Sequence, residues 1–130
     1  PLLEVFVGNN NMKMYTDEHT YTPIHSSKTI ILGSERIGTL LCSEIFSYTT
    51  VKKLNRENPS LVFFQSRMDV FHNNSWFIMH LRSFTKVAAA QMRTTIISST
   101  SNAPSLIISP YGRVLRYIPA SRTATTYTFE

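Results

Sequence analysis

The chain has 130 residues, of which 42% are hydrophobic and 16% charged, so it is long enough to bury one core and too apolar to be a disordered segment. Its net charge of +5 comes with thirteen Lys and Arg spread along the sequence, and this dispersal argues against a nucleic-acid-binding protein. A single cysteine excludes an internal disulfide, and no apolar run reaches the length of a membrane span. Because the chain begins at Pro1 without a methionine, we expect it to be a piece of a longer protein.

Two hairpins are predicted in the first third of the chain. Residues 2–7 and 12–15 are apolar segments around a cluster of Gly and Asn, which tolerate positive φ in a turn. A polar loop follows over residues 16–27. Residues 29–32 and 37–41 then form the second hairpin, and the apolar run 37–41 is predicted to be a buried strand.

This buried strand leads into Cys42, the polar pair Ser43 and Glu44, and a predicted helix over residues 44–55. Apolar residues at steps of three give that helix one buried stripe, formed by Ile45, Tyr48, Val51 and Leu54. A sharp turn from strand to helix exposes the side chain at the strand's end and brings backbone N–H groups close to it. A thiol there can act as a nucleophile while those N–H groups hold a developing oxyanion, so Cys42 is a candidate catalytic residue. The alternative is that Cys42 is a small buried core residue, as most free cysteines are.

The middle of the chain predicts a strand, a polar loop and the longest helix. The strand covers residues 60–64, the loop residues 65–75, and the helix residues 76–93 with Ser75 as its N-cap. The stripe predicted to face the core consists of Trp76, His80, Phe84, Val87 and Gln91, widened by Phe77, Leu81 and Ala88. On that stripe His80 is expected to be a hydrogen-bonded core histidine rather than a base.

The last third of the chain predicts a strand over residues 94–97, a polar loop over 98–104, and a third hairpin formed by residues 106–108 and 114–118. Strands that alternate with two helices, with hairpins at both ends, predict an α/β domain with one mixed sheet and two helices on one face. The opposite face of the sheet would stay apolar and uncovered. We therefore expect it to contact another copy of the chain or the missing part of a larger domain.

Three segments of the chain share their order and spacing with one known family. In residues 36–44 an apolar strand ends in the cysteine and a glutamate follows; residues 66–81 end in His-Leu; residues 100–105 run directly into 106–114. Together they resemble the second half of a carbon–nitrogen hydrolase (nitrilase superfamily) domain over residues 15–114. The resemblance is greatest to the apolipoprotein N-acyltransferase branch. In that branch the segment similar to residues 100–105 runs directly into the one similar to 106–114, whereas ordinary nitrilases usually carry an insertion at this junction.

The resemblance implies an α-β-β-α sandwich, with residues 1–130 as one incomplete domain, and a Glu–Lys–Cys triad in which Cys42 is the nucleophile. The N–H of Ser43 would be an oxyanion donor, and Glu44 would either position an amine or orient the turn. The acyl donor would be a phospholipid, the acceptor the N-terminal amine of a lipoprotein, and the location the periplasmic face of a membrane. The family's base glutamate lies in the half that this chain lacks, and Asp17 occupies the position of its lysine. The chain alone is therefore expected to be catalytically silent.

Other functional classes remain open on the sequence. A nitrilase-like amidase would use the same thiol with water as the acyl acceptor. A non-catalytic interaction module would use the apolar sheet face, and its cysteine would be structural. No cofactor and no metal site is predicted, because the chain has no Gly-rich phosphate loop and the spacing of His19, His25 and His72 matches no ligand set.

Overall fold

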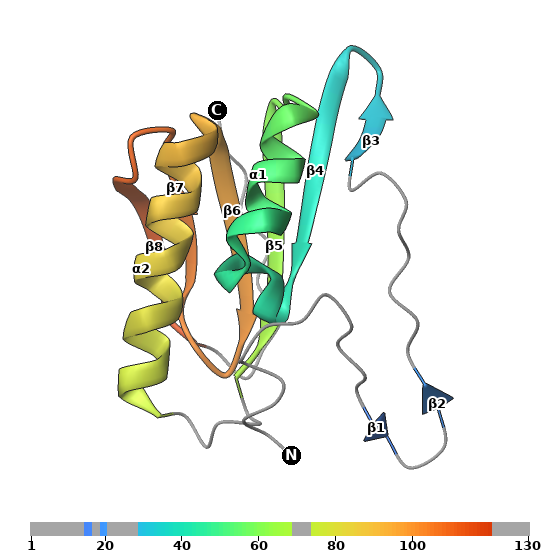
Figure 1. Ribbon diagram of the computed structural model, residues 1–130. Coiled ribbons are helices and arrows are strands. Elements are labelled where there is room, and N and C mark those ends of the chain that lie inside the picture. The colour runs from blue at the N-terminus through green and yellow to red at the C-terminus, as the bar shows by residue number, and fades with distance from the viewer. Residues whose placement is uncertain (1–14, 17–18, 21–28, 69–73, 121–130) are drawn as a thin grey trace.

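The computed structural model describes residues 15–16, 19–20, 29–68 and 74–120, which form the predicted mixed α/β architecture. Six strands make one sheet in the spatial order β3-β4-β5-β6-β7-β8 (Figure 1). They are β3 (Thr29–Leu32), β4 (Glu35–Leu41), β5 (Leu61–Arg67), β6 (Thr95–Ser101), β7 (Ser105–Ile108) and β8 (Val114–Ile118). Strands β4, β5 and β6 run parallel at the centre, and the remaining neighbours pair antiparallel. The hairpins β3–β4 and β7–β8 confirm two of the three predicted from the sequence.

The first predicted hairpin, over residues 2–15, lies outside the described residues except for Tyr15. Strands β1 (Tyr15–Thr16) and β2 (His19–Thr20) pair antiparallel, so the loop predicted over residues 16–27 contains a short ladder.

Both main helices cover the same face of the sheet, the one turned to the viewer in Figure 1. The short helix η1 (Cys42–Phe46) and α1 (Tyr48–Arg56) connect β4 to β5, and α2 (Ser75–Met92) connects β5 to β6. Alternate residues of the strands pack against the helices and form the core together with them: Leu40, Val62, Phe64, Ile96, Leu106 and Ile108 from the sheet, and Val51, Leu54, Leu81, Ala88, Ala89 and Met92 from the helices. The packing at Gly38 leaves no room for a side chain, because an added Cβ would lie 3.0 Å from Leu54 Cδ1 and 3.1 Å from Val62 Cγ2.

The helix predicted over residues 44–55 is interrupted at Ser47. This residue is extended, with φ −87° and ψ 102°, and its Oγ accepts a hydrogen bond of 3.3 Å from the backbone N–H of Thr50. Ser47 is thus the N-cap of α1 and separates it from η1. The interruption changes the helical phase, so Tyr48 is 65% exposed although it was predicted to face the core. The rest of that predicted stripe is buried: Ile45, Val51 and Leu54.

Helix α2 begins one residue earlier than predicted, and its N-cap is Asn74 rather than Ser75. The Asn74 Oδ1 accepts hydrogen bonds from the backbone N–H of Trp76 at 3.0 Å and of Phe77 at 3.4 Å. Both Asn and Ser are good N-caps, so composition alone could not separate the two neighbouring positions.

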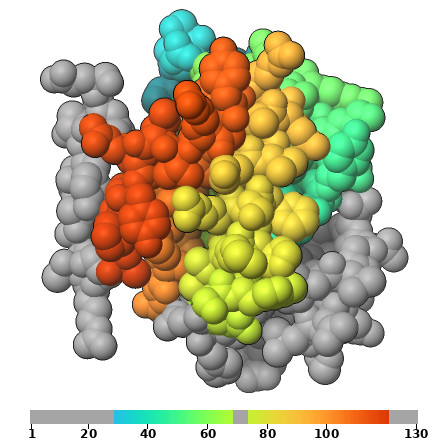
Figure 2. Space-filling model, turned by 90° about the vertical axis from the view of Figure 1, so that its left-hand side faces the viewer, coloured from blue at the N-terminus to red at the C-terminus, as the bar shows by residue number. Residues whose placement is uncertain are grey.

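The core face predicted for α2 is partly wrong: Leu81 and Ala88 are buried and Phe77 packs against the core as predicted, but the main stripe of Trp76, His80, Phe84, Val87 and Gln91 is not buried. Trp76 is 61% exposed, Val87 53% and Phe84 42%, and the ring of the half-buried His80 lies 4.0 Å from that of Trp76. The buried residues of α2 are Leu81 and Ala88, which were predicted, together with Thr85, Ala89 and Met92, which were not. In the space-filling view of Figure 2, the N-terminal half of α2 (yellow-green) is open to the viewer.

Two residue types explain why the other side of α2 packs on the sheet. Ala88 and Ala89 are small, so the helix backbone can approach the strands closely. The Thr85 hydroxyl is buried without a penalty, because it donates a hydrogen bond of 2.7 Å to the carbonyl oxygen of Leu81 in the preceding turn.

Strands β5 and β6 extend beyond their predicted ends at residues 64 and 97. Residues 65–67 and 98–101, predicted as the starts of polar loops, continue these strands. Strand β5 pairs with β6 as far as Ser101, whereas β7 pairs with it only as far as Ser98, so the ladder with β5 maintains β6 where the apolar pattern has ended.

The face of the sheet opposite the helices carries exposed apolar side chains. Phe63 is 40% exposed and Leu41 47% exposed, and both alternate with residues that point into the core. The predicted partner for this face stays a prediction. No described helix is long and apolar enough to cross a membrane.

Candidate functional site

The carboxyl ends of the three parallel strands meet at one edge of the sheet and border a cavity of about 370 Å³. Its lining comes from the β4–η1 junction and from the last residues of β5 and β6: Leu41, Cys42, Gln65, Ser66, Arg67, Ser99 and Ser101. Ligands of open α/β sheets bind at this edge, because the connections that leave adjacent strands diverge there. The cavity is therefore the candidate site.

Cys42 lies at the turn from β4 into η1, as the first residue of that helix. Leu41 before it is extended, with φ −121° and ψ 126°, whereas Cys42 has φ 47°, in the left-handed region that residues other than glycine avoid. The chain thus changes direction within one residue, and the half-buried thiol borders the cavity. Backbone held in this region clusters at functional sites, because it persists only where its surroundings impose it.

Ser43 and Glu44, the other two candidate catalytic residues, are not among the residues that line the cavity. The Glu44 Oε2 accepts a hydrogen bond of 2.8 Å from the backbone N–H of Leu41, and this ties the start of η1 back to the end of β4. Of the two roles predicted for Glu44, this contact favours the one that orients the turn. Ser43 is the second residue of η1, and the first N–H groups of a helix point out from its N-terminal end.

The polar residues contributed by β5 and β6 were not predicted as site residues. They are Gln65, Ser66, Arg67, Ser99 and Ser101. They were assigned to loops because the apolar pattern ends before them. The signal that could have identified them is their position, since each directly follows the buried part of a parallel strand.

The described part of the cavity wall offers a nucleophile and hydrogen-bond donors but no base. None of its lining residues is an Asp, Glu, His or Lys, and Arg67 is the one charged residue among them. His80 lies on the outer side of α2 against Trp76 and not at the cavity. Within the described ranges, no group of three His, Cys, Asp or Glu residues could hold a metal ion.

Comparison with known proteins rests on structure alone. No protein-family model matches the chain, and no curated protein matches it. Among solved structures, Saccharomyces cerevisiae Nit3, a member of branch 10 of the nitrilase superfamily, is similar with a TM-score of 0.65 and 14% identity over 77% of this chain. A carbon–nitrogen hydrolase from Helicobacter pylori G27 is similar with a TM-score of 0.66 and 10% identity over 77% of this chain. An amidase from Nesterenkonia sp. AN1, with acrylamide added at its active-site cysteine, is similar with a TM-score of 0.58 and 13% identity over 78% of this chain.

The chain spans only part of these structures, namely 39% of Nit3, 42% of the hydrolase and 42% of the amidase. At such identities the similarity establishes the fold and not the activity. The six-stranded mixed sheet with two helices on one face is thus shared with proteins of the nitrilase superfamily. The described chain has the fold of part of a nitrilase-superfamily (carbon–nitrogen hydrolase) domain.

Proposed function

We propose that Cys42 is the nucleophile of a carbon–nitrogen hydrolase-type acyl transfer. The observation that carries this proposal is the placement of the thiol, on a left-handed residue at the end of a parallel strand and beside a cavity. The thiolate attacks the carbonyl carbon of an amide, the C–N bond breaks, and the amine leaves with a proton, so that a thioester remains on Cys42. Water or another amine then attacks the thioester, takes the acyl group and returns the sulfur to the thiol.

The reaction needs a base and a cation that supports the oxyanion, and the described cavity wall supplies no carboxylate and no lysine. We propose that residues outside the described part supply them and that the chain alone does not turn over, either as a fragment that further sequence completes or as a degenerate relative. Since the chain spans 39% of Nit3, most of a comparable domain would lie elsewhere. The same missing part is the proposed partner of the exposed sheet face around Phe63. Phe63→Asp should leave this chain folded and should weaken assembly of the longer protein.

The proposal is tested by the reactivity of Cys42, mapped by mass spectrometry. In the folded chain, iodoacetamide should alkylate the thiol, whereas a structural core cysteine would react only after unfolding. In the full-length protein, a reactive acyl ester should form an adduct at Cys42 that hydroxylamine releases. Cys42→Ser, which changes a single atom, serves as the control and should abolish both reactions. A thiol that stays unmodified until the chain unfolds would instead support the non-catalytic interaction module.

The acyl acceptor separates two forms of the proposal. Strand β6 ends at Ser101 and β7 begins at Ser105, so three residues connect them. This short connection supports the acyltransferase form, because the resemblance to the apolipoprotein N-acyltransferase branch rests on tight spacing in this part of the chain. In that form the donor is a phospholipid ester, so a C–O bond breaks and the lipid alcohol leaves with a proton; the N-terminal amine of a lipoprotein then accepts the acyl group. In the amidase form the acceptor is water. The test is to trap the thioester in the full-length protein and compare its release by an N-terminal cysteine peptide with its release by buffer alone.

A further inference from the structure

The outward sides of α1 and α2 form one surface of the molecule, because both helices cover the same face of the sheet. On α1, Val51 and Leu54 are buried in the core, so the residues between and after them point away from the sheet. The cationic side chains of the two helices are all exposed: Lys52, Lys53 and Arg56 on α1, and Arg82 and Lys86 on α2. Cations that are spread along the sequence are thus gathered on one side of the fold.

Neither of these helices contains an Asp or a Glu. The two glutamates that flank η1 and α1 are held against strands of the sheet. The Glu57 Oε2 accepts a hydrogen bond of 2.6 Å from the Thr29 hydroxyl of β3, and the Glu44 Oε2 accepts one of 2.8 Å from the backbone N–H of Leu41. The outward surface of α1 and α2 is therefore cationic, and it is complementary to an anionic partner.

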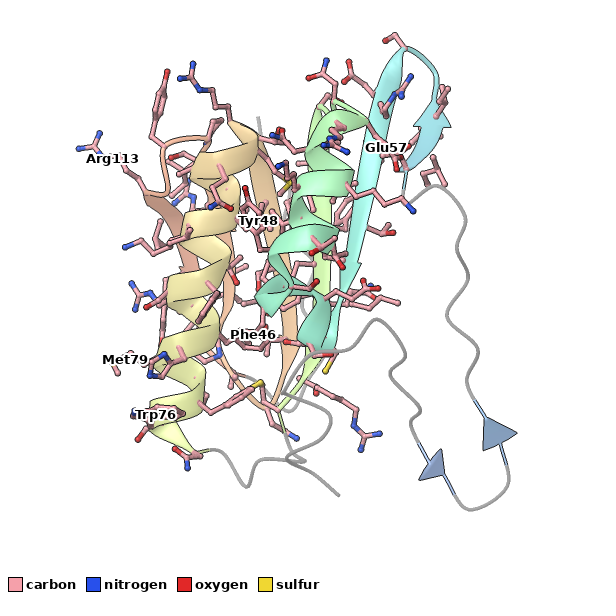
Figure 3. All side chains as sticks on the ribbon, viewed as in Figure 1. Phe46, Tyr48, Glu57, Trp76, Met79 and Arg113 are labelled. Carbon is pink, nitrogen blue, oxygen red and sulfur yellow. The ribbon has the colours of Figure 1, made fainter. Side chains whose placement is uncertain are left out.

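Exposed apolar side chains lie among these cations. On α2, Trp76, Met79 and Val87 are each more than half exposed, and Figure 3 labels Trp76 and Met79 on the N-terminal half of the helix. On α1, the exposed ring of Tyr48 has the Lys52 ammonium 5.6 Å from its centroid. A cationic surface that also exposes a group of large apolar side chains is typical of an interaction site.

The mixture of side chains indicates which kind of partner fits. Trp and Tyr favour the interface between water and membrane, aliphatic side chains favour hydrocarbon, and Lys and Arg bind anionic headgroups. A nucleic acid would instead need aromatic rings that stack on bases between cations. Here the rings of Trp76 and Tyr48 lie against His80 and Lys52 of their own helices, and Met79 has no ring to offer. The chemistry favours an anionic lipid surface.

We propose that the outward sides of α1 and α2 dock on the surface of an anionic phospholipid bilayer. Trp76, Met79 and Val87 enter the headgroup region, where their apolar surface leaves water. The long Lys and Arg side chains reach the lipid phosphates with their charged ends while their methylene groups cover apolar surface. This inference goes beyond the proposed function, because Cys42 takes no part in it, and either of the two can fail without the other.

The test is co-sedimentation of the full chain with lipid vesicles. The chain should sediment with vesicles that mix phosphatidylglycerol into phosphatidylcholine, and it should stay in solution with vesicles of phosphatidylcholine alone. High salt should release it, because exposed charges are screened. Each Lys or Arg at an anionic surface strengthens binding about fivefold, so Lys53→Gln should weaken it by about that factor. The triple variant Lys52→Gln/Lys53→Gln/Arg56→Gln should weaken it about a hundredfold.

Two further variants separate this surface from the net charge of the chain. Trp76→Gln should weaken vesicle binding about tenfold, because the apolar area of the indole no longer leaves water. Arg116→Gln is the matched control for Lys53→Gln, since it lowers the net charge by the same amount. The exposed Arg116 pairs with Ile107, which lies between two core residues of β7 and so points to the other face of the sheet. This control should bind like the wild type, and circular dichroism confirms that each variant is folded.

Three outcomes would overturn the inference. A chain that sediments with neither kind of vesicle does not bind lipid through this surface. Equal losses in Lys53→Gln and Arg116→Gln would show that net charge, and not the helix side, drives the binding. Sedimentation velocity without lipid tests a second copy of the chain as the partner: a dimer that Trp76→Gln dissociates, while this variant still binds vesicles like the wild type, would assign the surface to self-association.

Discussion

Replacing Cys42 by glycine should make the chain more stable than replacing it by alanine. The φ of 47° places this residue in the left-handed region, which costs a residue with a Cβ about 1–2 kcal/mol, whereas glycine adopts it freely. Glycine also gains freedom in the unfolded chain, which offsets about 0.4–1 kcal/mol of the relief. The net expectation is that Cys42→Gly exceeds Cys42→Ala by about 1 kcal/mol in the free energy of unfolding. For a chain of this length that is a difference of about 4 °C in Tm.

Gly33 provides the internal calibration for this comparison. It has φ 64°, and an added Cβ would meet nothing within 4 Å, so Gly33→Ala measures the cost of a left-handed alanine without any steric contact. Urea unfolding followed by circular dichroism should show Gly33→Ala destabilised by about 1 kcal/mol with an unchanged m value. If that variant is destabilised as expected while Cys42→Gly and Cys42→Ala are equally stable, the turn at Cys42 is not strained, and the reasoning from its backbone to its function is wrong.

Three further predictions use the same unfolding assay. Gly38→Ala should be destabilised by about 1–3 kcal/mol, because the new methyl group meets Leu54 at 3.0 Å. Leu54→Ala should relieve that clash, so the double variant should lose less stability than the two single variants together. A loss equal to the sum of the two single losses would contradict this. Asn74→Ala should cost about 1 kcal/mol, because it removes the N-cap of α2, and Ser75→Ala should change little; equal losses would assign the cap to both residues. Val87→Gln should stay within about 0.5 kcal/mol of the wild type, because this side chain faces away from the sheet; a loss of 2 kcal/mol or more would place it in the core.

Two of the three predicted hairpins and the number of main helices are confirmed, because turn residues and apolar runs are local signals. The turn with Pro110 first and Gly112 last, for example, lies between β7 and β8 as predicted, and Gly112 has φ 73°. Which side of a helix packs against the sheet could not be predicted from local sequence. Helix α2 has apolar residues on two sides, and what decides between them is the fit of Ala88 and Ala89 against the sheet.

The candidate site could be predicted at Cys42 but not around it. The thiol was recognised because an apolar strand runs directly into it. The opposite wall escaped prediction because Ser66 and Arg67, like Ser99 and Ser101, interrupt the apolar pattern that marks a strand. Their strand conformation comes from pairing with neighbours far away in the sequence, which no local pattern encodes.

The outward position of Trp76 determines what its fluorescence can report. It is the only tryptophan of the chain, and 61% of its side chain is already in contact with water in the folded state. Its emission should therefore be red-shifted in the native chain and should change little when the core melts. The same indole becomes a sensitive probe of anything that covers this side of α2, because burial there would shift its emission to the blue without any change in the fold.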